Sequence, residues 1–330
     1  ATPNGYRRVQ DLVGEQPEVI NGHGRAAKAV NVWKTGTKEV FELKTASGYR
    51  LKLTADHRVL TTNRGDVPAA ELTLDDHLIL ERPGFGKNVL PTDTAELVGA
   101  ALGDGCITHG KTQDHLFITL GHHEEAIAER LRNHLDSARE KLSTGDGRTT
   151  RRAEITKTAT SLRVGTSVRG LLEDLAAYAV LDEGSASKRF TDRVFELDAE
   201  SQAVILRALY TTDGTVADYG DKSQYVSLDS TSKELLSQVQ LLLLGFGIKS
   251  KLYENRRALS QQTTLMPDNQ GGEKEYDVQQ MHSLRVSKSS RFVFEREIGF
   301  LPESDKAKKL SDLNRRISGY QDHLYDAVAS

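Results

Sequence analysis

Two acidic residues in this sequence stand in a repeated setting that could support chemistry. Asp104 lies in the stretch ELVGAALGDGCIT (96–108), and Asp213 lies in VILRALYTTDGTV (204–216). Each stretch begins with apolar residues at helical spacing, and each acid is followed by glycine, a usual helix stop. Small residues recur on one face of both stretches, which lets two helix backbones approach closely. The pattern predicts two short helices packed side by side, with one carboxylate at the end of each.

Such a pair of carboxylates would suit a divalent cation. Two carboxylates held this close repel each other, so the arrangement is costly without a cation between them. Hard oxygen ligands suit magnesium or calcium. A single Asp-Gly after a helix is most often only a turn, so the metal hypothesis depends on the motif occurring twice within a longer repeat.

The elements around the two acids also repeat. Each acid is followed by a short β-type run, a helical run and a second β-type run. The two acids are separated by about 109 residues (213 − 104), a period too long for a solenoid. We therefore predict an internally duplicated domain with pseudo-twofold symmetry. The matching segments are 117–120 and 225–228, 124–135 and 233–244, and 161–167 and 283–289.

The two acidic stretches resemble the paired LAGLIDADG motifs of homing endonucleases. This resemblance implies an α+β fold in which two packed helices hold divalent metal over the scissile phosphates of a DNA duplex. It implies Asp104 and Asp213 as metal ligands, together with the preceding Gly103 and Thr212. The implied cofactor is Mg²⁺, with Mn²⁺ as a substitute. The residues that carry the resemblance are Leu97, Gly99, Leu102, Asp104 and Gly105 in the first motif, and Leu206, Ala208, Asp213 and Gly214 in the second.

The same resemblance implies a lysine near each metal, where it balances phosphate charge or positions the attacking water. Lys188 precedes the second motif, in a segment (181–197) that resembles the family block carrying a lysine. Lys288 lies at the end of the repeated strand and is our candidate for the second half. Its counterpart in the first half is Thr166, so the two half-sites would not be equivalent. The alternative for either lysine is an ordinary surface position.

Charge is distributed unevenly, although the net charge is only −3. Between Arg139 and Arg169 eight basic residues face three acidic ones, a local excess of five. Basic residues between strands suit a β-surface that follows DNA, and the alternative is a solvated loop face. We expect base-reading strands near 117–120, 149–166, 225–228, 247–257 and 283–288. The candidate DNA-binding residues are Arg148, Arg151, Arg152, Arg163, Lys249, Lys251 and Arg285.

Residues 1–82 have a different character, with short β-type runs separated by turn residues. Within them GYRLKLTADHRVLTT (48–62) resembles the Hint motif of inteins, with Thr54 and His57 in its Thr-x-x-His pattern. The resemblance implies that these two side chains polarise the peptide bond at a splice junction, and that the histidine protonates the departing amide nitrogen.

The expected architecture is therefore multidomain, an all-β Hint splicing domain joined to an α+β LAGLIDADG domain. We expect a partial Hint domain at 1–82, a linker at 83–91, an endonuclease domain at 92–318 with repeats of about 92–180 and 181–318, and the end of a C-terminal helix at 319–330. The segment starts after the position of an intein's first nucleophile and ends without a terminal asparagine. This segment alone is not expected to splice.

Three functions remain open from the sequence. The first is a site-specific endodeoxyribonuclease that cuts both strands in an intein. The second is a protein-splicing element whose endonuclease part is degenerate and only binds DNA. The third is a maturase-like nucleic-acid-binding protein without cleavage. The expected partners are double-stranded DNA and host exteins in cis, with a monomeric chain in the cytoplasm. No apolar run approaches the roughly 18 residues that a membrane span needs. The single cysteine excludes an internal disulfide.

Overall fold

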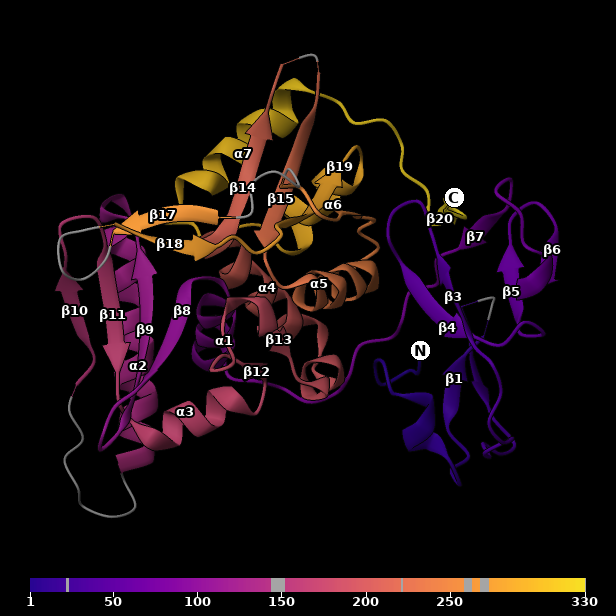
Figure 1. Cartoon of the computed structure of the whole chain (residues 1–330), viewed down its shortest axis with the longest axis horizontal. Helices are drawn as coiled ribbons and strands as arrows, with labels where there is room; N and C mark the ends of the chain where they lie inside the picture. The colour runs from indigo at the N-terminus through magenta and orange to yellow at the C-terminus, as the bar shows by residue number, and fades with distance from the viewer. Residues whose placement is uncertain (22–23, 144–151, 221, 258–262, 268–272, 330) are drawn as a thin grey trace.

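In the computed structural model, the two predicted helices pack against each other at the centre of the molecule (Figure 1). The structure describes the whole chain except residues 22–23, 144–151, 221, 258–262, 268–272 and 330. Helix α1 spans Thr92–Asp104 and helix α4 spans Ala199–Asp213. Most positions of both helices are buried, because apolar and small residues occupy almost every turn. Each helix ends at its aspartate, as the sequence predicts.

The first half of the repeat places a four-stranded antiparallel sheet after α1. The strand order is β10-β11-β9-β8. Leu116, Ile118 and Leu120 alternate along β9 and are buried, so one face of the sheet packs on the core and the other is free. The elements are β8 (Gly105–His109), β9 (Asp114–Leu120), α2 (Glu125–Ser143), β10 (Glu154–Lys157), β11 (Leu162–Thr166) and α3 (Arg169–Ala176).

The second half repeats this arrangement with strand order β14-β15-β19-β16, also antiparallel. The internal duplication is thus present in the fold. The elements are β14 (Gly214–Asp218), β15 (Gln224–Ser230), α5 (Lys233–Gly245), β16 (Lys251–Tyr253), β19 (His282–Ser287), α6 (Ser290–Glu297) and α7 (Asp305–Arg316). Two-residue strands β12 (Ala179–Val180) and β13 (Arg189–Phe190) connect the halves.

Strands are present in all five ranges expected to read bases, although residues 149–151 lie outside the described residues. The sequence missed β8 and β14, which follow the two aspartates directly. Between β16 and β19 the chain forms an antiparallel hairpin of β17 (Thr263–Pro267) and β18 (Glu273–Asp277).

A β-rich unit, formed by residues 1–82, lies beside the duplicated unit (Figure 1). Its strands make two hairpins, β1-β2 and β3-β4, and a four-stranded sheet in which β7 and β6 flank β5. They are β1 (Glu18–Ile20), β2 (Ala26–Lys28), β3 (Phe41–Lys44), β4 (Arg50–Leu53), β5 (Arg58–Thr61), β6 (Gly65–Pro68) and β7 (His77–Ile79).

The C-terminal helix expected at 319–330 is wrong. Helix α7 ends at Arg316, Ile317 is already extended, and the chain then crosses to the β-rich unit as strand β20 (Tyr325–Ala327). Strand β20 completes the sheet by pairing with β7. The apolar residues at helical spacing are misleading here because Ser318-Gly319 interrupts them, and Gly319 packs against the backbone of Lys288. The duplicated unit therefore lies between two strands of a single sheet.

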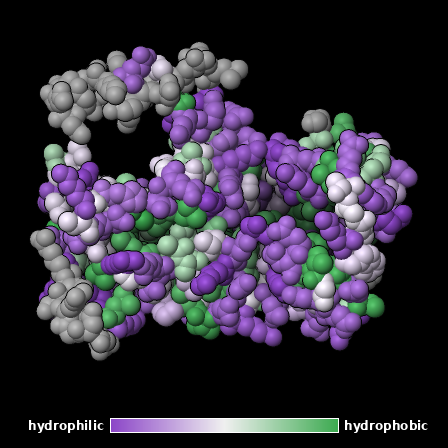
Figure 2. All heavy atoms as spheres, turned by 60° about the horizontal axis from the view of Figure 1, so that its bottom comes forward, coloured by the Kyte–Doolittle hydropathy of each residue, from purple (hydrophilic) through white to green (hydrophobic). Residues whose placement is uncertain are grey.

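The two units are joined by specific contacts. The amide of Leu252 in β16 donates to the carbonyl of Ser47. Tyr49, Leu80 and Leu244 form a small apolar cluster between the units. Hydrophilic side chains cover most of the face shown in Figure 2, with apolar side chains in smaller patches. No helix in the described ranges has the length and apolar character needed to span a membrane.

Candidate active site

Two glycines set the close approach of α1 and α4. A Cβ on Gly99 would lie 2.1 Å from the carbonyl oxygen of Ile205. A Cβ on Gly103 would lie 2.2 Å from Oγ1 of Thr212 and 3.3 Å from Cβ of Asp213. Neither position has room for a side chain, so the helix backbones touch along this seam. The seam leads to the ends of both helices, where Asp104 and Asp213 lie together.

Both carboxylates are half-buried, and their environment disfavours the ionised pair. Burial raises the pKa of Asp213 to about 6, and the nearby negative charge of Asp104 adds to this shift. Burial also raises the pKa of Asp104, with a smaller contribution from Glu124. The positive charges of Lys188 and Lys306 oppose both shifts without cancelling them. The site therefore holds more negative charge than its own lysines balance.

Lys188 lies at the end of α1, close to both acids. It is only 8% exposed, and its Nζ donates to the carbonyl oxygens of Leu102 at 3.0 Å and Gly103 at 2.7 Å. The last carbonyls of a helix lack partners within the helix and carry partial negative charge, so a lysine is favoured there. Burial lowers the pKa of Lys188, and the charges of Asp104 and Asp213 oppose that shift.

A second lysine occupies the matching place on α4, and it is not the one expected from the sequence. Nζ of Lys306 donates to the carbonyl oxygens of Thr211 at 2.6 Å and Thr212 at 3.1 Å. Burial lowers the pKa of Lys306, while Asp104 and Asp213 are among the acids that oppose this. Ser304 caps α7 through its hydroxyl and fixes the turn that carries Lys306.

Lys288 does not reach the carboxylates. In the second sheet Leu284 pairs with Leu228, and Leu228 pairs with Gly214, the neighbour of Asp213. Lys288 lies four residues beyond Leu284, about 13 Å farther along the strand direction. The strand repeat suggested Lys288, whereas the useful signal was the lysine-rich start of α7. That signal alone does not distinguish Lys306 from Lys308 and Lys309.

The donor set at the helix ends fits a hard divalent cation. The two carboxylates offer oxygen ligands, and the carbonyls of Gly103 and Thr212 lie beside them with one lysine contact each. Among the described residues, no group of three or more His, Cys, Asp and Glu side chains gathers at one point. Magnesium commonly binds through one or two carboxylates and keeps several waters, so a site this sparse suits it.

The free faces of the two sheets carry several of the predicted basic side chains. Arg163 on β11 and Lys251 on β16 are exposed. Arg285 on β19 stacks between the rings of Tyr225 and Tyr253, with its guanidinium carbon 4.2 Å and 4.7 Å from the ring centres. Such stacking fixes the direction of a guanidinium while leaving its donors free.

The remaining predicted basic residues are placed differently. Arg152 is exposed just before β10, and Arg148 and Arg151 lie outside the described residues. Lys249 turns toward the β-rich unit, where Nζ lies 3.3 Å from the carboxylate of Asp326 and donates to the carbonyl of Tyr325 at 2.7 Å.

Thr54 and His57 lie on one turn after β4, away from the helix ends. The amide of His57 donates to the carbonyl of Thr54 at 3.1 Å, and the carbonyl of His57 accepts from the amide of Ala69 at 2.8 Å. The hydroxyl of Thr54 donates to the carboxylate of Asp56. The imidazole of His57 is exposed. The structure thus brings this pair together, in a different unit from the two carboxylates.

A family model described as "LAGLIDADG-like domain" matches residues 200–299. This range begins in α4, contains Asp213 and extends through the second sheet to the end of α6. Residues 200–299 carry a LAGLIDADG-like domain. The first half of the LAGLIDADG-like duplication, with α1 and Asp104, is identified by its repetition of the same elements.

Curated relatives match over much of the chain. The alpha chain of the ribonucleoside-diphosphate reductase NrdEB of Bacillus subtilis is 27% identical over 317 residues, 89% of this chain and 28% of the relative. The GyrA-type chain of DNA gyrase from Mycobacterium kansasii is 24% identical, over 74% of this chain and 46% of the relative. The replicative DNA helicase DnaB of a Nostoc species is 29% identical, over 74% and 28%. The chain spans less than half the length of each.

Solved structures show a distant likeness. The homing endonuclease I-DmoI in complex with DNA and Ca is 16% identical with a TM-score of 0.43, covering 68% of this chain and 97% of that one. The homing endonuclease I-WcaI bound to its DNA recognition sequence is 14% identical with a TM-score of 0.39, covering 67% and 88%. At TM-scores this low, no residue of this chain takes a role from the superpositions.

Proposed function

We propose that the duplicated unit is a site-specific DNA endonuclease that makes metal-dependent cuts in both strands of a duplex. The observation that carries the proposal is the matched arrangement at the helix ends. Asp104 with Lys188, and Asp213 with Lys306, form two similar groups about one seam. Two adjacent groups of this kind suit two strand breaks at neighbouring phosphates.

The roles of the side chains follow from their charges. When bound, magnesium would supply an activated water and would stabilise the charge that develops on the phosphate. Asp104 and Asp213 would hold it, because their mutual repulsion is relieved by a cation. Lys188 and Lys306 stay close to the reacting phosphates and offset their negative charge. In each cut, water adds to phosphorus, one P–O bond breaks, and the leaving oxygen takes up a proton.

The free sheet faces would bind the duplex. Phosphate contacts by lysine and arginine supply affinity and its salt dependence, while strand side chains at base edges supply sequence preference. Arg163 and Arg285 occupy corresponding positions on the central strands of the two sheets. We assign them to opposite arms of one DNA site.

We further propose that the β-rich unit is a Hint-type splicing domain and that the endonuclease unit is inserted in it. Strands β7 and β20 pair in one sheet although the whole duplicated unit separates them in sequence, which supports an insertion. The matched relatives have unrelated names, a reductase, a gyrase and a helicase. A segment shared by enzymes so different suggests a self-contained element rather than a part of any one activity. Thr54 and His57 would be its splicing groups, and the flanking host chains its partners.

Selection from a random library tests the nuclease on many candidate targets at once. Circular plasmids bearing a randomised duplex of about 40 base pairs are incubated with the chain in Mg²⁺ or in EDTA, and linear products are sequenced. We expect one long motif to be enriched in Mg²⁺ only. An absence of enriched cuts in Mg²⁺ and Mn²⁺ would contradict the nuclease. Retention of the motif without nicking would instead favour the alternative, a degenerate unit that only binds DNA.

A further inference from the structure

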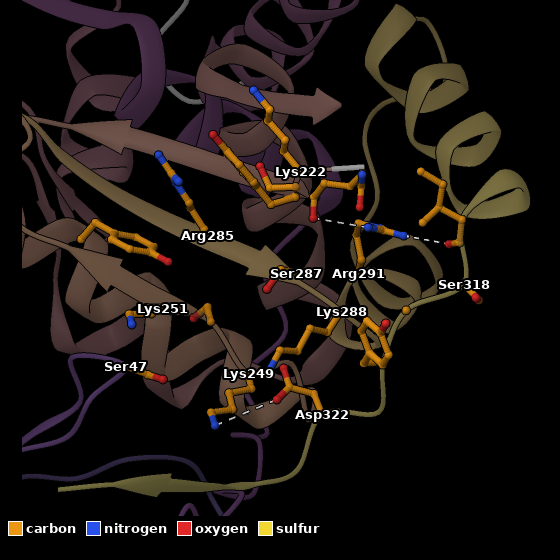
Figure 3. A pocket seen from close by; sticks show the side chains of 18 of the residues that line it. Ser47, Lys222, Lys249, Lys251, Arg285, Ser287, Lys288, Arg291, Ser318 and Asp322 are labelled. Carbon is orange, nitrogen blue, oxygen red and sulfur yellow. Dashed lines mark hydrogen bonds and ion pairs between the residues drawn. The ribbon is translucent and has the colours of Figure 1, made fainter. Parts of the chain in front are cut away.

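A basic trough continues the second sheet toward the β-rich unit. Its volume is about 880 Å³, and it is formed by β15, β16, β19, the end of α7 and the tail that follows (Figure 3). Lys222, Lys249, Lys251, Arg285, Lys288 and Arg316 line it, with Asp322 as the acidic side chain of the lining. We call this pocket the trough. Its charge fits a polyanion.

Several cations of the trough have a carboxylate partner and two that face it do not. Lys249 is held by Asp326, and Arg316 pairs with Asp218 at 2.9 Å. Lys251 and Lys288 are exposed, and no described carboxylate lies within ion-pair distance of either. Arg285 stacks on tyrosine rings instead of pairing with an acid. Lys251 and Lys288 are therefore available to an external anion.

The tail forms a fixed wall of the trough. The amide of Ser289 donates to the carbonyl of Tyr320 at 2.9 Å, and the amide of Asp322 donates to the hydroxyl of Ser289 at 2.7 Å. A Cβ on Gly319 would lie 2.5 Å from the carbonyl carbon of Lys288, so only glycine allows this approach. Lys288 itself has a φ of 51°, a conformation that non-glycine residues adopt at a cost. The backbone is thus held in a strained form that presents Lys288 at the trough.

The first half has no equivalent of these two lysines. Lys251 pairs across the strands with Arg285, and the residue that pairs in the same way with Arg163 is Thr156. The counterpart of Lys288 is Thr166, which is buried and accepts a hydrogen bond from the amide of Val168. The pseudo-twofold symmetry of the fold is therefore broken in charge, on the side that faces the β-rich unit.

We propose that a DNA duplex bound across the two sheets extends past the second sheet into the trough, where Lys251 and Lys288 contact the phosphates of one flank. The footprint on DNA is then longer on the side of the second half. This inference rests on the proposed DNA binding, and it adds an arm that the symmetric sheets do not supply. Tyr320, 87% exposed on the tail, borders the path.

Salt dependence of binding tests the trough. The probe is a fluorescent 50-base-pair duplex of arbitrary sequence, titrated with the full chain in Ca²⁺ at salt concentrations from 50 to 300 mM. The double variant Lys251→Gln/Lys288→Gln is compared with Lys28→Gln/Lys52→Gln, which removes two exposed lysines of the β-rich unit. We expect the slope of log K against log[salt] to become shallower by about 2 in the trough variant only, with Kd at 100 mM raised by roughly tenfold or more.

The outcomes separate the two proposals. If the wild-type chain binds duplex DNA and the trough variant has the wild-type slope and Kd, the trough is overturned and the DNA-binding unit stands. If the control variant loses as much slope as the trough variant, the contacts are diffuse and the trough is again overturned. If the wild-type chain does not bind duplex DNA, the proposed function fails, and the trough fails with it.

Discussion

Lys188 and Lys306 donate to the last carbonyls of two different helices, at 2.7 Å from the oxygen of Gly103 and 3.1 Å from that of Thr212. They come from distant parts of the chain, yet each caps the helix that ends in one of the two aspartates. This places one ammonium group and one carboxylate in each half of the site. Each half can therefore be perturbed separately.

Replacing one lysine should impair one strand cut more than the other. We expect Lys306→Met to slow cutting roughly 10²-fold or more in its own half, because a preorganised charge next to the phosphate is lost. A supercoiled plasmid carrying the selected site should then accumulate as nicked circles. Lys308→Met, an exposed position on the same helix, is the control and should give linear product at the wild-type rate. Equal slowing of both strands would argue against separate halves.

The seam between the helices should not tolerate a methyl group. We expect Gly99→Ala to destabilise the protein by about 1–3 kcal/mol, since its Cβ would overlap the backbone of Ile205. Denaturant unfolding measures the change. Gly170→Ala is the matched control, because its Cβ would meet only the side chain of Leu142 at 3.3 Å, and alanine is the better helix former. Comparable losses in the two variants would show that the seam is not tightly packed.

Removing one carboxylate should stabilise the protein when no divalent metal is present. The pKa of Asp213 is about 6 in the fold and near 4 in an unfolded chain, so ionisation is disfavoured in the fold. The resulting cost develops between about pH 4 and pH 6 and is complete above pH 6. We expect Asp213→Asn to raise the free energy of unfolding by roughly 1–3 kcal/mol at pH 7.5 in EDTA, and by little at pH 4.

Chemical denaturation across this pH range measures the effect, and added Mg²⁺ provides its control. Magnesium should stabilise the wild-type chain and have much less effect on Asp213→Asn, because binding to the folded state is linked to stability. A variant less stable than wild type at both pH values would contradict the raised pKa.

Cleavage should be lost at acidic pH in a way that depends on magnesium. Protons and metal compete for the same carboxylates, so a raised pKa weakens metal binding as the pH falls. At limiting Mg²⁺ the rate should fall to half near pH 6, and higher Mg²⁺ should move this midpoint to lower pH. Initial rates at two Mg²⁺ concentrations between pH 5 and pH 8 measure it. A midpoint that does not move with Mg²⁺ would assign the titration to another group.

The sequence was most informative where a local pattern occurs twice. The two acidic motifs, their glycines and the alternating strands that follow predicted α1, α4 and the duplicated sheets, since the close approach of helices needs small residues at fixed spacing. Lys188 also lies near the acids, where the resemblance of its segment to a known block suggested it.

The errors came from contacts between distant parts of the chain. Lys306 reaches α4 only because the loop before α7 packs against Thr211, whose hydroxyl accepts from the amide of Leu301. No spacing rule contains that information. Strand β20 is three residues long and forms by pairing with β7, so its apolar neighbours resemble a helix when taken alone. Local periodicity does not report pairing over such separations.

The most direct test of the central claim is to measure binding and cutting together in Asp104→Asn and Asp213→Asn. Each variant is titrated onto the selected duplex in Ca²⁺ and then assayed for nicking in Mg²⁺. We predict that both variants bind with a Kd within about threefold of wild type and that neither produces linear DNA. Linear product from either variant would contradict a site built on both carboxylates.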